Sequence, residues 1–423
     1  MMTSRDRMIE TLSHREPDRV AIDLGATNAT GINAVVYNKL KNLLGINDGQ
    51  VKVTDIIGQL AEVEPDVLNR LGGDVVMLRR LAPSLGIPIR GFKPGKLTDG
   101  TNCLHADSYH PMHDENDNMV LYKMTDGTDR IHPFPFNNAY QQYDKGMIVA
   151  KLPKGSYSFA RVYHPLRNID TIEELDKFGF PEIDGEEVEF LTNEAKRLYT
   201  HTDKAICGIF MGNVFELGQL YWGYQKFFEF MLLEPDMVQH YFERRTEAFM
   251  RDLDKFLGAV GKYIHIIDFW DDLGTQDSLL LSPQLYRSTV KPFHAKMFDF
   301  VKKNYPHLKI FFHSCGAIYD LIPDFIEIGV DILNPVQISA YGMDPARLKK
   351  EFGQHLVFWG GGVDTQKVLN NGTVEDVRKM SKQMLDIFAP GGGYVFSQVH
   401  NIEACVPAEN VLAAFEMAKN YRK

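Results

Sequence analysis

The stretch KIFFHSCGAIYDLIPDFIEIGVDILNPVQ, residues 309–337, contains one complete strand–helix–strand unit. The runs at 309–315 and 331–337 have the length and apolar character of buried strands. Between them, from Ile318 to Ile328, apolar residues recur at helical spacing. A helix that joins two strands is typical of a parallel sheet, so this stretch indicates an α/β fold.

The same alternation extends along the chain. Eight apolar runs have strand character, at 20–25, 74–78, 205–210, 263–270, 309–315, 331–337, 355–361 and 393–399. Eight strands close a parallel (β/α)8 TIM barrel, so we expect residues 1–423 to form a single domain of this kind. Residues 90–165 break the rhythm with Asp-Gly pairs between alternating runs such as MVLYKM and MIVAKL. This pattern predicts a hairpin-containing insertion between the second and third barrel units.

The composition excludes several classes of protein. A hydrophobic fraction of 44% is enough for a large core, and a formal charge of -10 argues against a nucleic-acid-binding surface. The N-terminus lacks the apolar core of a signal peptide, and no apolar run reaches the roughly 18 residues of a membrane span. Four scattered cysteines are too few for a disulfide scaffold. We therefore expect a cytoplasmic protein that binds neither nucleic acid nor membrane.

Polar residues gather at the carboxyl ends of the predicted strands, where a barrel of this kind has its active site. We predict a catalytic group consisting of Asp74, Glu216, Asp272 and His400. We predict a substrate-binding group consisting of Asn28, Asn213, Asn334, Gln337 and Gln398. Asp74 differs from the others because it is the first residue of its predicted strand, 74–78, rather than lying at the carboxyl end.

His313 and Cys315 are the strongest candidates for a metal site. Alternate residues of a strand share a face, so the imidazole and the thiol point into the same space. Zinc binds both groups, and a catalytic zinc has three protein ligands and one open position. The pair alone is also compatible with simple burial at a strand end. His400, which follows the last predicted strand, supplies a third ligand, and we therefore predict zinc at His313, Cys315 and His400.

The pair Asp271–Asp272 has two interpretations. The two carboxyl groups can share a proton, with like-charge repulsion raising one pKa for acid–base chemistry. Alternatively, one of them caps the following turn and the other is solvated. The sequence leaves both open.

Several long segments together resemble the uroporphyrinogen decarboxylase superfamily. These are RDRMIETLSHREPDRVAID, DDLGTQDSLLLSPQLYR, residues 309–337, LVFWGGGVDTQ and HNIEACVPAENVLAAFE. The resemblance covers nearly the whole chain and implies a (β/α)8 barrel that is usually a homodimer.

The superfamily contains decarboxylases and cobalamin-dependent methyltransferases. The resemblance to decarboxylases implies a pyrrole-binding aspartate at Asp74 and a shared histidine at His400. The arginine-rich loop that those enzymes have after the first strand reads DLGATNATGIN here, without arginine. The methyltransferases bind zinc through His-x-Cys and a later cysteine. His313 and Cys315 match the first two positions, His400 takes the place of the cysteine, and Cys405 lies five residues further on.

The sequence is thus closer to the methyltransferase branch. That resemblance implies zinc, a corrinoid (cobalamin) carried by a partner protein, and methyl transfer to a small thiol or folate acceptor or from a methylated donor. One alternative is a metal-independent decarboxylase of a small aromatic or pyrrolic acid. Another is a barrel that holds a tetrapyrrole or corrinoid without turnover.

Overall fold

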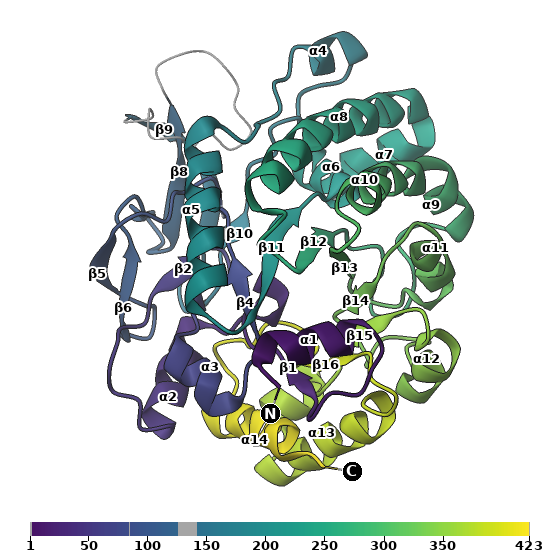
Figure 1. Cartoon of the computed structure of the whole chain (residues 1–423). Coiled ribbons are helices and arrows are strands. Elements are labelled where there is room, and N and C mark those ends of the chain that lie inside the picture. Colours follow the sequence, from purple (N-terminus) through teal and green to yellow (C-terminus); the bar gives the residue numbers. More distant parts are fainter. Residues whose placement is uncertain (1, 84, 126–141, 423) are drawn as a thin grey trace.

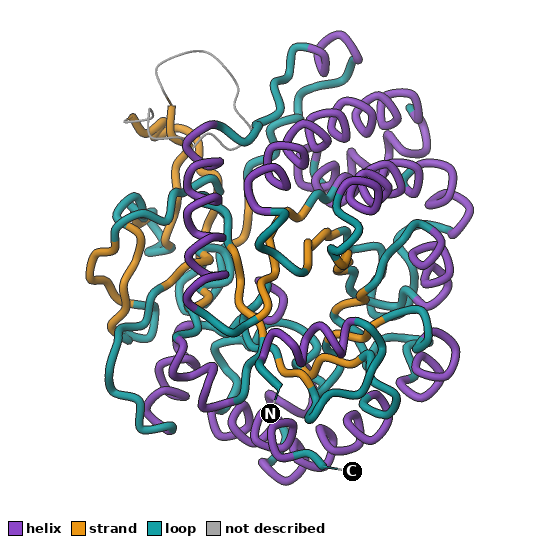
Figure 2. The backbone as a smooth tube through the Cα atoms, viewed as in Figure 1, coloured by secondary structure: helices purple, strands orange, loops and turns teal. Residues whose placement is uncertain are grey.

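The computed structural model describes residues 2–83, 85–125 and 142–422. Eight parallel strands form one sheet in the order β1-β16-β15-β14-β13-β12-β11-β4. Their bounds are β1 (Ala21–Ile22), β4 (Val75–Leu78), β11 (Ala205–Met211), β12 (Ile266–Trp270), β13 (Lys309–His313), β14 (Ile332–Asn334), β15 (Val357–Trp359) and β16 (Tyr394–Phe396). Figure 2 shows these strands as a ring surrounded by helices. The predicted eight-stranded (β/α)8 barrel is confirmed.

The ring closes between its first and second strands. The Asp74 backbone N–H, directly before β4, donates to the Ile22 carbonyl in β1 at 2.8 Å. The Asp74 carboxylate accepts the Ile22 N–H at 3.0 Å and forms ion pairs with Arg7 at 2.7 Å and Arg19 at 2.8 Å. Arg7 belongs to helix α1 (Ser4–Leu12), which packs across the amino-terminal end of the barrel (Figure 1).

Alternation along each strand separates two apolar cores. Phe311 belongs to the cluster inside the ring, whereas Phe312 belongs to the cluster between the ring and the outer helices. His313, two residues after Phe311, therefore lies on the inner side at the carboxyl end of β13.

The outer layer consists of helices that follow the strands. The longer ones are α2 (Ala34–Leu43), α5 (Gly185–His201), α6 (Val214–Trp222), α7 (Tyr224–Leu233), α8 (Pro235–Val260), α10 (Lys291–Asn304), α12 (Pro345–Phe352), α13 (Val374–Phe388) and α14 (Ala408–Asn420). Shorter ones are α3 (Pro65–Leu71), α4 (Ile172–Asp176), α9 (Pro283–Thr289) and α11 (Ile322–Glu327), with single turns at Asn28–Thr30, Tyr319–Leu321 and Thr365–Leu369. No helix among the described residues is long and apolar enough to cross a membrane.

The predicted insertion lies between β4 and β11 and contains antiparallel hairpins, as expected. Strands β5 (Phe92–Lys96) and β6 (Asn102–Ala106) form one hairpin. A second sheet pairs β7 (Met112–His113), β8 (Met119–Thr125), β9 (Gln142–Leu152) and β10 (Ala160–Arg161) in the order β10-β9-β8-β7. Two short strands before β4, β2 (Val53–Asp55) and β3 (Leu60–Ala61), pair with each other. Figure 1 shows these elements together on one flank of the barrel.

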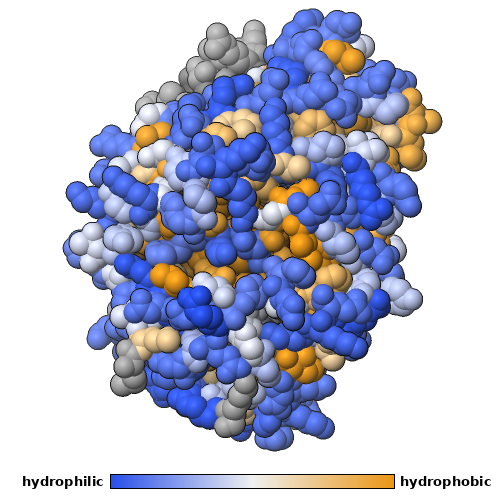
Figure 3. Space-filling model, turned by 45° about the vertical axis from the view of Figure 1, so that its right-hand side comes forward, coloured by the Kyte–Doolittle hydropathy of each residue, from blue (hydrophilic) through white to orange (hydrophobic). Residues whose placement is uncertain are grey.

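The surface in Figure 3 is mainly hydrophilic, and apolar residues gather near the centre of this face and in smaller patches. Apolar residues scattered over a surface in this way do not by themselves indicate a site. The site emerges instead from the polar side chains at the carboxyl end of the barrel.

Candidate active site

Three predicted metal ligands meet at the carboxyl ends of β13 and β16. One ligand atom from each of His313, Cys315 and His400 lies within 4.8 Å of the other two. The Cys315 Sγ is 3.3 Å from the His313 Nε2, and the two imidazole centroids are 5.7 Å apart. Two imidazoles and a thiol are the donor set that zinc binds, so the residues present fit this metal. Cys405 is exposed and does not belong to this group.

His313 is held in one tautomer by the strand next to it. The Asn334 Nδ2 donates to the Trp359 carbonyl at 2.8 Å, so its Oδ1 is left to accept from the His313 Nδ1–H at 2.6 Å. The ring also stacks on Trp270, with centroids 4.3 Å apart. The Nε2 lone pair therefore faces Cys315 and is available for a metal.

The loop that carries Cys315 is fixed by the loop after β12. The Cys315 N–H donates to the Asp272 Oδ1 at 2.8 Å. Gly316 follows with φ at +92°, and a Cβ there would lie 2.5 Å from the Gly274 backbone. Only glycine permits both this conformation and this close approach. Asp272, a predicted catalytic residue, is thus adjacent to the three ligands, with its Oδ1 3.7 Å from the His313 Nε2.

Asp271 has a different role from its neighbour. Its carboxylate accepts the N–H groups of Phe215 at 3.0 Å and Glu216 at 2.6 Å, at the first turn of α6. The His294 Nε2 also lies 2.8 Å from the Asp271 Oδ2. No hydrogen bond joins Asp271 to Asp272 in the described part of the chain, which favours capping over a shared proton. Asp271 thus caps α6, the helix that follows the neighbouring strand β11. It does not cap the turn that follows Asp271 itself.

The uncharged forms of the three predicted ligands are favoured. Burial lowers the pKa of His313, lowers the pKa of His400 to about 4, and raises the pKa of the Cys315 thiol. Asp272 adds to the rise for Cys315 through its negative charge. Neutral imidazoles have the lone pairs that a metal needs, and a bound cation would reverse the shift of the thiol.

Glu216 lies on the first turn of α6, and the Asn213 Nδ2 donates to its Oε2 at 3.0 Å. Burial, with the negative charges of Asp272 and Asp271, raises the pKa of Glu216 to about 7. A carboxyl group with this pKa can exchange a proton near neutrality, which suits the predicted catalytic role.

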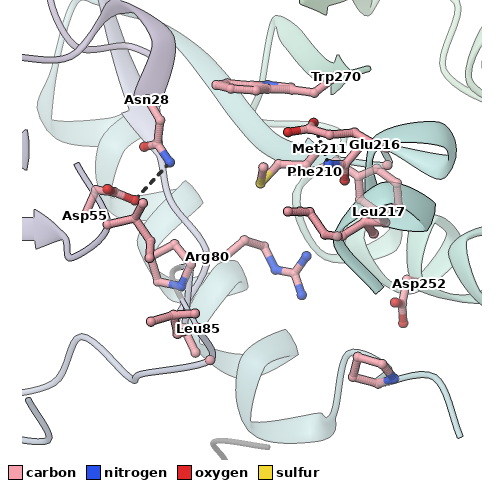
Figure 4. Close-up of a pocket in the computed structure, with 18 of the residues that line it drawn as sticks. Asn28, Asp55, Arg80, Leu85, Phe210, Met211, Glu216, Leu217, Asp252 and Trp270 are labelled. Carbon is pink, nitrogen blue, oxygen red and sulfur yellow. Dashed lines mark hydrogen bonds between the residues drawn. The ribbon is translucent and has the colours of Figure 1, made fainter. Parts of the chain in front are cut away.

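A cavity of about 840 Å³ is lined by His400 at one strand end and by Arg161 from the insertion. The predicted substrate-binding residues Asn28 and Asn213 line it, together with Glu216 and Trp270. Figure 4 shows Trp270 and Glu216 on one side of this space and Asn28, hydrogen-bonded to Asp55, on the other. This cavity is large enough for a small-molecule substrate.

The other predicted substrate-binding residues have different positions. Gln337 lines a second cavity of about 250 Å³ together with Cys315 and His400, and its Oε1 accepts the Gly316 N–H at 2.8 Å. Asn334 supports His313 through the hydrogen bond between its Oδ1 and the His313 Nδ1. Gln398 is 1% exposed and lines neither cavity, so the structure does not place it for substrate contact.

Asp74 does not join the site. It lies at the amino-terminal end of β4, in the ion pairs with Arg7 and Arg19, while His400 lies at the carboxyl ends of the strands. The pairing of Asp74 with His400 expected for a decarboxylase is therefore absent from this structure. The physical reason is strand direction, because the residue that begins a barrel strand faces the end opposite to the active site.

Three arginines that line the large cavity are missing from the sequence-based prediction: Arg80, Arg161 and Arg245. Arg80 follows β4 by two residues, so the strand-end rule could have identified it. Arg161 comes from the insertion and Arg245 from the interior of α8, and the sequence contains no signal that places either at the cavity.

Comparison with known proteins identifies a family. A model of the family "Uroporphyrinogen decarboxylase (URO-D)" matches residues 150–421. Over 274 residues the chain is 24% identical to uroporphyrinogen decarboxylase 2, chloroplastic, of Oryza sativa subsp. japonica, which covers 62% of this chain and 64% of that protein. It is also 24% identical to a uroporphyrinogen decarboxylase of Hordeum vulgare, covering 75% of that protein.

A methyltransferase from Methanosarcina mazei has a similar structure, with a TM-score of 0.57 and 16% sequence identity over 99% of each chain. At this identity the likeness establishes a shared fold across the whole chain.

Proposed function

The chain belongs to the uroporphyrinogen decarboxylase family, and on this premise we propose that it is a zinc-dependent methyltransferase. It moves a methyl group between a corrinoid carried by a separate protein and a small acceptor or methylated donor. The observation that carries the proposal is the convergence of His313, Cys315 and His400 within 4.8 Å beside a substrate-sized cavity. The shared fold with a methanogen methyltransferase supports it.

Each residue has a defined part in this chemistry. His313, Cys315 and His400 would hold the metal, and Asn334 would orient His313 for it. The bound zinc supplies a positive charge that keeps a thiol acceptor as thiolate or, in the reverse direction, polarises the oxygen of a methyl ether. Asp272 fixes the Cys315 loop. Glu216, with a pKa of about 7, takes the proton that the thiol loses or returns it to the leaving oxygen.

The corrinoid of the partner protein would supply the methyl group to the thiol sulfur, and Glu216 would take the proton that the thiol loses. A homodimer, as the family resemblance implies, remains a prediction.

A second candidate is a metal-independent decarboxylase that acts on a small aromatic or pyrrolic acid. It is supported by the names of the plant relatives and by Arg161 in the cavity, whose positive charge suits a carboxylate substrate. Arg80 also lines the cavity, but its guanidinium forms an ion pair with Glu187. Activity that survives chelation would favour this candidate.

The first test is the zinc content of purified protein supplied with zinc, measured by mass spectrometry beside His313→Ala, Cys315→Ala and His400→Ala. We expect about one zinc per chain in the wild type and a loss of at least about tenfold in each variant, because three ligands are needed for a stable site. Cys405→Ala is the matched control, since it removes an exposed cysteine outside the site. A wild type without zinc would overturn the proposal.

A further inference from the structure

Arg245 is a buried cation that has no hydrogen-bonding partner among the described residues. It lies in the interior of α8, is 5% exposed, and lines the same cavity as His400. Its Nε and Nη1 atoms are buried and have no hydrogen-bond partner, and no ion pair reaches it among the described residues. A buried charge with unsatisfied donors is costly, so its retention calls for a ligand or a compensating contact.

Aromatic contacts compensate only part of this cost. The guanidinium carbon lies 3.7 Å from the Phe249 ring centroid and 5.2 Å from that of Phe180. Stacking stabilises the cation through the face of the guanidinium. It leaves the N–H groups, which lie in the plane of the guanidinium, unsatisfied. The Tyr241 hydroxyl, one helical turn before Arg245, is likewise buried without a partner.

The acidic side chains around the cavity are already engaged elsewhere. Asp252 accepts the Ile183 N–H at 2.7 Å and forms no ion pair with Arg245 in the described structure. Burial raises the pKa of Asp252, and the positive charge of Arg245 opposes that rise from a distance without satisfying the N–H groups of Arg245. Each of the others also has a protein partner. Asp55 accepts from Gly58, Glu182 pairs with Arg251, Asp184 caps α5, Glu187 pairs with Arg80, and Glu216 accepts from Asn213. The unsatisfied group in this cavity is therefore a donor, and its natural complement is an anion.

We propose that Arg245 anchors a carboxylate group of the small-molecule substrate, whose reacting group lies toward His400. The planar guanidinium matches the two oxygens of a carboxylate. A singly charged carboxylate suits walls formed by Phe180 and Phe249 better than a doubly charged phosphate, because it is less costly to desolvate. This inference deepens the proposed function and rests on it for the position of the reacting group.

The test measures binding rather than turnover. Isothermal titration calorimetry on zinc-supplied protein compares hexanoate with hexanol, and mercaptohexanoate with mercaptohexanol. We expect each acid to bind the wild type at least about tenfold more tightly than its alcohol. Arg245→Gln should abolish this preference, and Arg245→Lys should reduce it by keeping the charge but losing the planar fork.

Arg251→Gln is the matched control, because Arg251 lies on the same helix, pairs with Glu182 and has a side chain that is 54% exposed. It should keep the full preference for acids. Zinc content and the thermal unfolding midpoint show whether each Arg245 variant is folded. If Arg245→Gln does not fold, Arg245→Lys provides the comparison with the wild type.

The outcomes separate this inference from the proposed function. No preference for hexanoate over hexanol in the wild type, or an equal preference in both Arg245 variants, would overturn the carboxylate anchor whatever the zinc content. Stronger binding of phosphate than of hexanoate would overturn it too. Absence of zinc would overturn the methyltransferase while the hexanoate comparison still decides the anchor, since that pair of probes has no thiol.

Discussion

Glu216 shows how one side chain acquires acid–base character from its surroundings. It is placed on the first turn of α6, where the Asp271 carboxylate accepts its backbone N–H. The charges of Asp271 and Asp272 and the loss of water together move its pKa to about 7. A solvated glutamate would be fully ionised at neutral pH and a poor acid. The protein environment therefore gives this carboxyl group both protonation states in the physiological range.

A pH dependence follows from this pKa. If Glu216 accepts the thiol proton, it must be ionised, so kcat/KM for methyl transfer should rise as the pH rises through about 7 and then level off. Glu216→Gln should remove this rise and lower kcat/KM by about 10²-fold or more. The rate with methylcobalamin and a thiol acceptor measures both effects. Glu229→Gln, an exposed change on α7, should leave the profile unaltered. An unchanged profile in Glu216→Gln would remove Glu216 from the proton transfer.

At the scale of elements, three neighbouring strands together position the side chain of His313, a predicted metal ligand. His313 ends β13, Asn334 ends β14, and the Trp359 carbonyl ends β15. The hydrogen bonds run from His313 through Asn334 to Trp359, across the sheet at its carboxyl edge. Parallel strands in register bring these residues side by side although they are far apart in the sequence. The tautomer of His313 is thus a property of the sheet.

Asn334→Ala should weaken zinc binding without removing a ligand. Loss of the amide leaves the His313 Nδ1–H without its acceptor and the ring free to rotate or change tautomer. Loss of such a supporting group typically costs about 10–100-fold in metal affinity. Competition with a chromophoric chelator measures the zinc Kd. Asn304→Ala, which changes an exposed amide at the end of α10, is the control. An unchanged Kd in Asn334→Ala would show that the hydrogen bond does not support the metal site.

For the whole molecule, the decisive contact is the closure of the ring between β1 and β4. The buried Asp74 carboxylate receives Arg7 from α1, Arg19 from the segment before β1, and the Ile22 N–H. One side chain therefore ties the first helix, the first strand and the second strand together at the amino-terminal end. Its role is structural in this position, and the site at the opposite end depends on it only through the fold.

Asp74→Asn should destabilise the protein while leaving the site intact in folded molecules. Two arginines would lose their buried counter-charge, and breaking such a pair costs about 3–5 kcal/mol. Denaturant unfolding measures the loss, and zinc content per folded chain should not change. Asp18→Asn, which removes a more exposed partner of the same Arg7, should cost only about 1 kcal/mol. A variant of Asp74 with normal stability and no turnover would instead assign this residue to the chemistry.

Much of the barrel could be predicted from local patterns. All eight strands, the insertion with its hairpins and the spacing of His313 and Cys315 depend on residues that are neighbours in the sequence. Burial alternation and helical period are local properties, so they are legible without a structure. The position of His400 beside His313 and Cys315 was also predictable, because strand ends of a closed barrel meet at one edge.

Local sequence patterns specify the order of strands and helices and the residues at each strand end. Which of these polar groups meet depends on the three-dimensional packing of the chain. It separated Asp74 from His400, divided the tasks of Asp271 and Asp272, and brought Arg245 from α8 to the cavity with no hydrogen-bond partner for its buried Nε and Nη1 among the described residues. The physical reason is that hydrogen bonding and burial depend on residues tens to hundreds of positions away, and their identity is set by packing rather than by local pattern.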